Sequence, residues 1–484
     1  MLYCIQYSLL SWRRSCVLST YRPVTTAIIN ELKQLLGEKN VITDADKLVV
    51  YSHDEVTDPH YHHAPEVVVF PASTEEVAEV LRLANRELIS VVPRGAGTGL
   101  ACGAVPLYGG IVLSVEKLNQ IIKVDTENMY ITVQAGVRTE EVQQTAKAAG
   151  LFYAGDPCSG DSCFIGGNAA TNAGGNKAVK YGTTRHQIYE MEVVTPQGAI
   201  TTLGGRLAKS STGYNLDQLL IGSEGTLGII TQLTLKLIPL PQNSMDLLAV
   251  FTDIHTPIAM VSKIIKEVTT PTCIEFMDNT AIQSVENFLN EKLPHSDNGH
   301  YLIIQLEGNN IDELEDFAVA IDEICMANGA LAVMMPDPQK IWRARKSAAE
   351  AFRHETLIHS NEDIVVPLDK LPLAMHTMAD ICEKHQAVTR FVSHAGDGNI
   401  HISILQGDIP EDRWQQKLAD IHQDIFDFVY PLGGKLSGEH GIGYKKKDLM
   451  EKYTDPVQLE MMRAIKKALD PNNILNPGKI FDVK

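Results

Sequence analysis

Short apolar stretches alternate with amphipathic ones between residues 62 and about 240. Residues 65–71 (PEVVVFP) and 89–95 (ISVVPRG) are apolar runs of strand length. Residues 74–88 lie between them and repeat apolar positions every three or four residues behind a capping Thr74, which predicts a helix. Further strands are predicted at 109–115, 129–136, 189–198 and 228–241, with a helix at 139–150. Strands and helices do not alternate regularly, so the pattern predicts an α+β fold.

A second pattern begins after the proline pair near residue 241, which predicts a domain boundary. Residues 245–253, a helix at 256–267, residues 300–308 and a helix at 311–329 give the order strand, helix, strand, helix. A similar order recurs from residue 362 to residue 407. We interpret the two series as ferredoxin-like halves of an α+β cap. The predicted parts are an extension of unknown role at 1–30, a first domain at 31–241, a cap at 242–430 and a short C-terminal helical segment at 431–484.

Composition and charge limit the classes of molecule that this protein is expected to bind. The 484 residues include 42 Lys and Arg against 60 Asp and Glu, a net charge of −18. This charge opposes binding to nucleic acid or to an anionic membrane surface. No apolar run reaches the 18 residues that a membrane span needs, so no transmembrane segment is predicted. A small molecule or a protein is the expected partner.

The first 30 residues contain no acidic residue and three arginines. This composition is typical of an organellar transit peptide, but an unstructured start ahead of a helix explains it equally well. The predicted location is the cytoplasm, with the mitochondrion as the alternative if the segment is a transit peptide.

Glycine-rich loops are the first feature of the sequence that indicates a ligand-binding site. Glycines 95, 97, 99 and 103 follow the strand at 89–95, and such a loop lets backbone N–H groups approach an anion such as a pyrophosphate. The loop matches neither the dinucleotide fingerprint nor a Walker loop, so alone it is equally consistent with a simple turn. Two further loops rich in Gly, Ser and Asn, at 155–182 and 219–230, predict that three loops converge on one extended ligand.

The segments PRGAGTGL, IGGNAATNAGG, KYG and GSEGTLGII resemble the FAD-binding domain of the vanillyl-alcohol oxidase/p-cresol methylhydroxylase (PCMH-type) flavoprotein family. With HAGDGNIH, SGEHGIG and NPGKIF, the chain from about residue 30 onward is similar to its D-lactate dehydrogenase and glycolate oxidase flavin-subunit branch. The resemblance implies a PCMH-type FAD-binding domain at 31–241, with the C-terminal segment completing the FAD and metal sites. It also implies noncovalent FAD, because covalently flavinylated members usually carry histidine where this chain has Thr98. The implied FAD-binding residues are Gly95, Ala96, Gly97, Thr98, Gly99, Asp156, Pro157, Ser162, Gly166, Gly167, Asn168, Gly174, Gly175, Glu224, Gly228 and Ile229.

His394 and His401 flank a Gly-Asp-Gly turn that is too rich in glycine for a helix. From the residues alone structural histidines are favoured over metal ligands, since the spacing is no standard zinc pattern. The resemblance implies a divalent metal, zinc with iron or manganese as alternatives, held by His394, His401 and Glu439. It further implies His440 as the general base and Arg345 as the residue that binds the substrate carboxylate, although Arg345 could also be an exposed basic helix residue.

The resemblance implies oxidation of a D-2-hydroxy acid, with D-lactate to pyruvate as the leading reaction. Glycolate and D-2-hydroxyglutarate are alternatives, and so is a non-catalytic subunit that relays electrons. Related D-2-hydroxyglutarate dehydrogenases carry a lysine shortly before the proline that matches Pro367. This chain has Glu362 and Asp363 there, which would repel a second carboxylate if they face the pocket. Electrons would pass to a separate acceptor such as an electron-transferring flavoprotein, an iron-sulfur subunit or a quinone, and no nicotinamide fingerprint is present.

Overall fold

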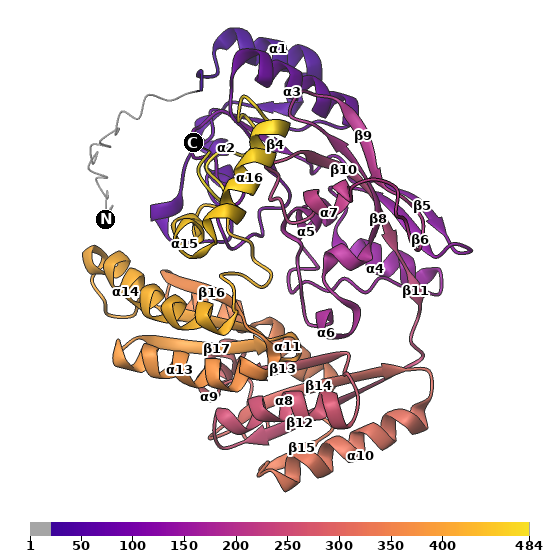
Figure 1. Ribbon diagram of the computed structural model, residues 1–484, viewed down its shortest axis with the longest axis vertical. Coiled ribbons are helices and arrows are strands. Elements are labelled where there is room, and N and C mark those ends of the chain that lie inside the picture. The colour runs from indigo at the N-terminus through magenta and orange to yellow at the C-terminus, as the bar shows by residue number, and fades with distance from the viewer. Residues whose placement is uncertain (1–20, 484) are drawn as a thin grey trace, which may run out of the picture.

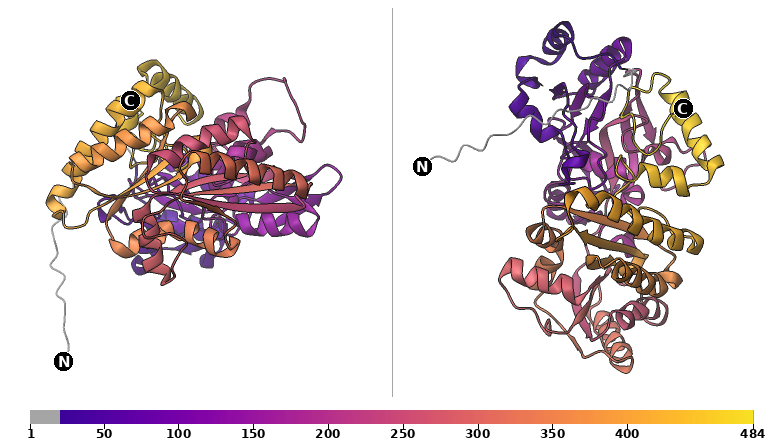
Figure 2. Two further views of the ribbon diagram at one scale, coloured as in Figure 1. Left: turned by 90° about the horizontal axis from the view of Figure 1, so that it is seen from below. Right: turned by 90° about the vertical axis from the view of Figure 1, so that its left-hand side faces the viewer.

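The computed structural model describes residues 21–483 and shows two lobes, with the first and last parts of the chain together in the upper one (Figure 1). The prediction for residues 1–20 lies outside the described residues, while residues 26–30 already belong to helix α1 (Thr26–Leu36). The right-hand view of Figure 2 shows the same two lobes from the side. None of the described helices is long and apolar enough to cross a membrane.

The upper lobe contains three sheets. One has the order β1-β2-β4-β3, with β2, β3 and β4 parallel, and another has the antiparallel order β5-β6-β10-β8-β9. The third pairs β7 with β11. The strands are β1 (Val41–Ile42), β2 (Val67–Val69), β3 (Val91–Arg94), β4 (Ile111–Ser114), β5 (Ile121–Asp125), β6 (Tyr130–Gln134), β7 (Leu151–Phe152), β8 (Ile188–Val194), β9 (Ile200–Gly204), β10 (Ile229–Lys236) and β11 (Ile238–Pro239).

Helices of the upper lobe pack on these sheets around one large apolar core. Helix α3 occupies nearly the predicted range, but Ser73 rather than Thr74 caps it, since the Ser73 side chain accepts a hydrogen bond from Glu76 N. Thr74 is instead buried and donates to Glu192. The helices are α1, α2 (Ala45–Leu48), α3 (Thr74–Glu87), α4 (Thr139–Ala148), α5 (Ile165–Thr171), α6 (Ala178–Tyr181) and α7 (Leu216–Leu220).

The lower lobe is built on one antiparallel sheet of seven strands in the order β15-β12-β14-β13-β17-β18-β16. Its first four strands have the ferredoxin-like order, while the second half adds three strands to the same sheet because β13 pairs with β17. The predicted boundary at 241 lies between β11 and β12. The strands are β12 (Asn243–Phe251), β13 (Cys273–Met277), β14 (His300–Gly308), β15 (Ala332–Met334), β16 (His359–Val365), β17 (Val388–His394) and β18 (Asn399–Leu405).

Helices cover both faces of this sheet and bury two separate apolar clusters. One face packs against α8 (His255–Glu267), α10 (Ile311–Ala327), α13 (Leu371–Lys384) and α14 (Glu411–Val429). The other face packs against α9 (Asn279–Leu289), α11 (Pro338–Lys346) and α12 (Ala348–Glu355). The α+β fold class is therefore confirmed.

The chain returns to the upper lobe after the sheet, through α15 (Lys447–Tyr453) and α16 (Pro456–Leu469) (Figure 1). Ile474 and Leu475 join the apolar core of the upper lobe, where Leu475 pairs with Val91 of β3. Lys466 Nζ donates to Thr226 O at 2.8 Å. The loop between α14 and α15 thus lies where the two lobes meet.

Candidate active site

A β-hairpin brings the two predicted histidines together. His394 ends β17, His401 lies in β18, and their ring centroids are 5.1 Å apart. The turn between them needs glycine at Gly398, because φ is +79° and a Cβ atom would lie 2.3 Å from Val366 O. The turn, and not a helix, therefore sets the distance between the two imidazoles.

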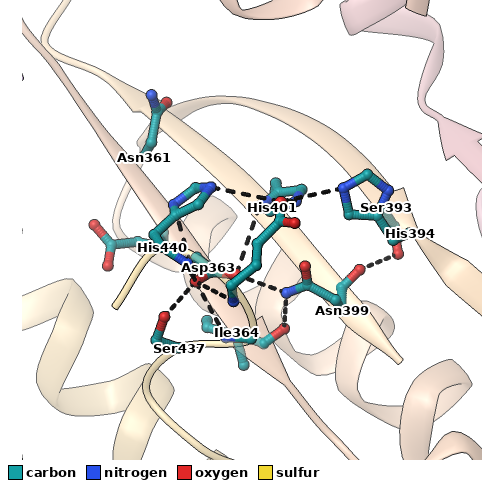
Figure 3. Close-up of polar contacts among 12 residues, drawn as sticks. Asn361, Asp363, Ile364, Ser393, His394, Asn399, His401, Ser437 and His440 are labelled. Atoms are coloured by element: carbon teal, nitrogen blue, oxygen red, sulfur yellow. Dashed lines mark hydrogen bonds and ion pairs between the residues drawn. The ribbon is translucent and has the colours of Figure 1, made fainter. Parts of the chain in front are cut away.

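The loop at residues 437–443 carries Glu439 and His440 to the same place, and Figure 3 shows His440 beside His401. Glu439 Oε1 lies 3.2 Å from Nε2 of His394 and 3.2 Å from Nε2 of His401. The His440 ring stacks on His401 with centroids 5.0 Å apart. Gly174 makes room for this loop, since a Cβ there would lie 2.6 Å from Glu439 Oε2.

These donors fit a divalent metal. One ligand atom from each of His394, His401 and Glu439 can be chosen so that all lie within 4.8 Å of one another. Two imidazole nitrogens and one carboxylate oxygen suit zinc, iron or manganese. The second nitrogen of His394, Nδ1, lies 2.8 Å from Glu275, which is the carboxylate support that metal-bound histidines usually have.

Mutual attraction between these groups outweighs the effect of their burial. Burial favours the neutral form of Glu439, but His394 and His401 hold the pKa of this carboxyl well below its usual range. Burial also opposes charge on His394, but Glu275 and Glu439 raise the pKa of its imidazole. His440 differs, because burial lowers its pKa to about 4. His440 is therefore neutral near pH 7 and able to accept a proton.

Arg345 is buried at the end of α11, with 4% of its surface exposed, so it is not an exposed helix residue. Its Nε and Nη2 atoms lie 3.0 and 2.8 Å from Glu275 Oε2. Sequence reasoning missed Glu275, although it is the one charged residue in the apolar strand CIEFM, and buried charges normally have a partner. The Glu275 carboxylate thus contacts both Arg345 and His394, so the three side chains form one continuous ionic network.

Glu362 and Asp363 do not act as the sequence suggested. Neither lines the cavity described below. Glu362 lies 2.9 Å from His422 Nε2 and 3.5 Å from Lys445 Nζ, and these partners hold its pKa well below the usual range although burial opposes this. The predicted repulsion of a second substrate carboxylate is therefore wrong for Glu362, because adjacent β16 side chains point to opposite faces and its charge is compensated.

A cavity of about 770 Å³ extends from the glycine loops to Glu439 and His440. Gly95 and Gly167 both line it; a Cβ on Gly95 would be in ordinary van der Waals contact with Gly167 Cα at 3.6 Å, while a Cβ on Gly167 would meet nothing within 4 Å. Asp156, Gly174, Gly175, His394, His401 and Arg345 lie outside the lining. The predicted residues that do line it are Gly95, Ala96, Gly97, Thr98, Gly99, Pro157, Ser162, Gly166, Gly167, Asn168, Glu224, Gly228, Ile229, Glu439 and His440.

Glu224 connects this cavity with the loop that carries His440. Its carboxylate accepts hydrogen bonds from the backbone N–H groups of Ile442 and Gly443, both at 2.7 Å. Burial raises the pKa of Glu224 to about 6. The glycine-lined cavity and the histidine cluster are therefore parts of one site.

Comparisons with known proteins agree with this arrangement. Residues 65–204 match the family described as "FAD binding domain", and residues 240–480 match "FAD linked oxidases, C-terminal domain". The D-lactate dehydrogenase of Anaerostipes hadrus is 38% identical, over 95% of this chain and 98% of that protein. The chain belongs to the FAD-linked oxidase family.

Other members of the FAD-linked oxidase family are similar over comparable lengths. The glycolate oxidase subunit GlcD of Bacillus subtilis (strain 168) is 35% identical, covering 95% of this chain and 97% of that protein. The D-2-hydroxyglutarate dehydrogenase of Stutzerimonas stutzeri (strain A1501) is 35% identical, covering 94% and 99%. A p-cresol methylhydroxylase structure with substrate bound has the same fold, with a TM-score of 0.78, 19% identity and coverage of 94% and 96%. This FAD-linked oxidase is therefore an oxidoreductase of the group that these relatives form.

The glycine-lined cavity fits FAD, and Gly167 offers a direct test. Replacing Gly167 with leucine is expected to keep the fold, because its Cβ meets no protein atom, but to place a side chain in the cofactor cavity. Overpacking of about 1–3 kcal/mol would weaken FAD binding roughly 5- to 150-fold. Titration of the flavin-free protein with FAD, followed by fluorescence, measures this loss. Gly205→Leu is the matched control, since its Cβ would meet only Leu207 in an exposed loop. Equal FAD affinity in both variants would contradict this placement of the cofactor.

Proposed function

We propose that this FAD-linked oxidase oxidises D-lactate to pyruvate, with His394, His401 and Glu439 holding a divalent metal. The observation that carries the proposal is the contact between this cluster and a cavity that also contains His440. A divalent cation at this position supplies positive charge that lowers the pKa of a nearby hydroxyl group and anchors a carboxylate. FAD supplies the hydride acceptor.

The residues of the chain then have distinct tasks. His440 accepts the hydroxyl proton, because it is neutral near pH 7 and its Nε2 atom lies 3.8 Å from Glu439 Oε1, on the side of the proposed metal site. Arg345 is the residue proposed to bind the substrate carboxylate, although it does not line the cavity and Glu275 already engages two of its nitrogen atoms. The C2–H bond breaks with hydride transfer, and pyruvate retains the former hydroxyl oxygen as its C2 carbonyl oxygen.

The pairing of β16 with β18 determines which polar groups lie beside the histidine cluster. Asn361 and Asp363 lie on one face of β16, opposite Ser403 and His401 of β18. The side-chain Oδ1 of Asn361 accepts a hydrogen bond from Ser403 Oγ at 2.7 Å, so these two residues place neutral groups next to Asp363 and His401. Lys445 is bonded to Asn361 O and is close to Glu362. Strands β16 and β18 therefore offer no free cation for a second carboxylate, but Lys346 lines the cavity, so the choice among D-lactate, glycolate and D-2-hydroxyglutarate rests on the reduction experiment.

Anaerobic addition of D-lactate to the purified yellow protein tests the proposal. Loss of the flavin absorbance near 450 nm is expected, and it should disappear after metal chelation. If only glycolate or only D-2-hydroxyglutarate bleaches the flavin, that acid is the substrate instead of D-lactate. If none of the three acids bleaches it, a non-catalytic subunit that relays electrons is favoured. When D-lactate does reduce the flavin, the acceptor is identified by testing which of an electron-transferring flavoprotein, an iron-sulfur subunit and a quinone reoxidises the reduced flavin.

A further inference from the structure

Asp363 lies against the loop that carries Glu439 and His440, and Figure 3 shows it between Ser437 and His440. It is fully buried in β16. Its Oδ2 atom accepts hydrogen bonds from the backbone N–H groups of Gly438, Glu439 and His440 at 3.1, 3.1 and 2.8 Å, and from Ser437 Oγ at 2.5 Å. One carboxylate oxygen thus binds the backbone of three consecutive residues.

This binding explains how two neighbouring side chains reach the same site. In an extended strand, Glu439 and His440 would point to opposite sides. Three consecutive N–H groups that converge on one oxygen instead curl the backbone around it, as in the concave nests that bind anions. Gly441 then continues with a φ of +85°, which the loop needs to turn toward Glu224.

Asp363 also faces the two stacked imidazoles. The Nδ1 atoms of His401 and His440 are buried, and among the described residues neither has a hydrogen-bond partner. They lie 3.8 Å from Asp363 Oδ1 and 3.9 Å from Asp363 Oδ2. A negative charge on this side favours the tautomer with hydrogen on Nδ1, which leaves the Nε2 lone pairs free on the side of Glu439.

Asp363, His401 and His440 could themselves be viewed as a second metal-binding group, since their ligand atoms also lie within 4.8 Å of one another. The hydrogen bonds of Asp363 argue against this. Besides the four bonds to Oδ2, its Oδ1 atom accepts one from Asn399 Nδ2 at 2.7 Å. A carboxylate has about four lone-pair sites, two on each oxygen, so Oδ2 has no capacity left for a metal ion and Oδ1 has a single site left.

We propose that Asp363 is a positioning residue, which holds Glu439 and His440 in one orientation and directs Nε2 of His401 and His440 toward the reaction site. This inference rests on the proposed metal site. It extends that proposal by naming the residue that shapes the ligand set without touching metal or substrate.

The variant Asp363→Asn tests the inference through metal binding. Asparagine keeps the size of the side chain but replaces one acceptor oxygen by an NH₂ group, so it cannot satisfy all the donors. We expect the variant to retain FAD, seen at 450 nm, while its affinity for Zn²⁺ falls about 10- to 100-fold, the usual cost of losing a group that supports metal ligands. Competition with a chromophoric chelator on metal-free protein measures the affinity. The visible spectrum of bound Co²⁺ should also change, because it reports ligand geometry.

Glu362→Gln is the matched control. Glu362 is equally buried in the same strand and has charged partners, but they lie on the opposite face. Loss of the Glu362 negative charge should reduce the thermal stability of the protein without changing its affinity for Zn²⁺ or the spectrum of bound Co²⁺. If Asp363→Asn yields no folded protein, Ser437→Ala removes one of the donors and should give a smaller loss of Zn²⁺ affinity in the same direction.

Wild-type Zn²⁺ affinity in the Asp363 variant, or equal losses in both carboxylate variants, would overturn the positioning role and leave the proposed function intact. In the fallback case, unchanged Zn²⁺ affinity in Ser437→Ala would overturn it as well. Absence of Zn²⁺ and Co²⁺ binding in the wild-type protein would instead overturn the metal site itself, and the inference with it.

Discussion

Replacing His440 with alanine is expected to slow the reduction of bound FAD by D-lactate at least 100-fold, without release of the flavin. A positioned general base contributes roughly 10²- to 10⁴-fold. His440 is the neutral, buried imidazole on the cavity side of the cluster, and its side chain is absent from the hydrogen bonds that hold the loop, which use its backbone N–H. Anaerobic stopped-flow mixing, followed at 450 nm, gives the rate constant.

His422→Ala provides a comparison for this variant, because His422 is also a largely buried histidine of the lower lobe but contacts Glu362 on the other face of β16. D-lactate should reduce the FAD bound to the His422→Ala variant at nearly the wild-type rate. Since burial lowers the pKa of His440 to about 4, the wild-type rate should stay level from neutral pH to about pH 5 and fall as the pH approaches 4. Reduction of the His440 variant at the wild-type rate would remove this residue from the role of base.

Removal of the divalent metal is expected to suppress reduction by D-lactate even more, by roughly 10³-fold. A cation beside the reacting hydroxyl contributes several kcal/mol, and each 1.36 kcal/mol corresponds to a factor of ten in rate. Glu439→Gln should have the same effect, because it removes the charged oxygen that lies 3.2 Å from both histidine nitrogens. FAD should remain bound in both cases, since the glycine loops that line its cavity are unchanged.

Metal analysis and anaerobic bleaching on the same samples measure this effect. Addition of Zn²⁺, Mn²⁺ or Fe²⁺ to chelated protein should restore bleaching with at least one ion, which would identify the metal. The Glu439 variant should not recover with any of them at comparable concentrations. Full activity in protein that metal analysis shows to be metal-free would refute the metal site.

The sequence predicts local features of this fold well. The range 300–308 coincides with β14, and the helix predicted at 74–88 is α3 except for its cap. Both depend on periodicity and length, which are local properties. The glycines around Asp397 likewise predict the turn between His394 and His401.

The parts that sequence reasoning missed depend on pairing between distant strands. Asp363 reaches His401 because β16 pairs with β18, and Glu275 reaches His394 because β13 pairs with β17. No local pattern shows which strands are neighbours in a seven-stranded sheet. The same limit explains the error at Glu362, since alternation separates its face from that of Asp363 but does not reveal which face borders the reaction site.

The loop at residues 437–443 is held from both lobes, by Asp363 below and by Glu224 above. Both carboxylates precede the loop in the chain by more than seventy residues, so during synthesis they leave the ribosome before the segment that they bind. The upper lobe is also incomplete without Leu475, which pairs with Val91. Since domains generally fold in the order of synthesis, we expect the contacts between this loop and the two carboxylates to form last. We therefore expect the FAD cavity and the histidine cluster to be completed together, because one loop contributes to both.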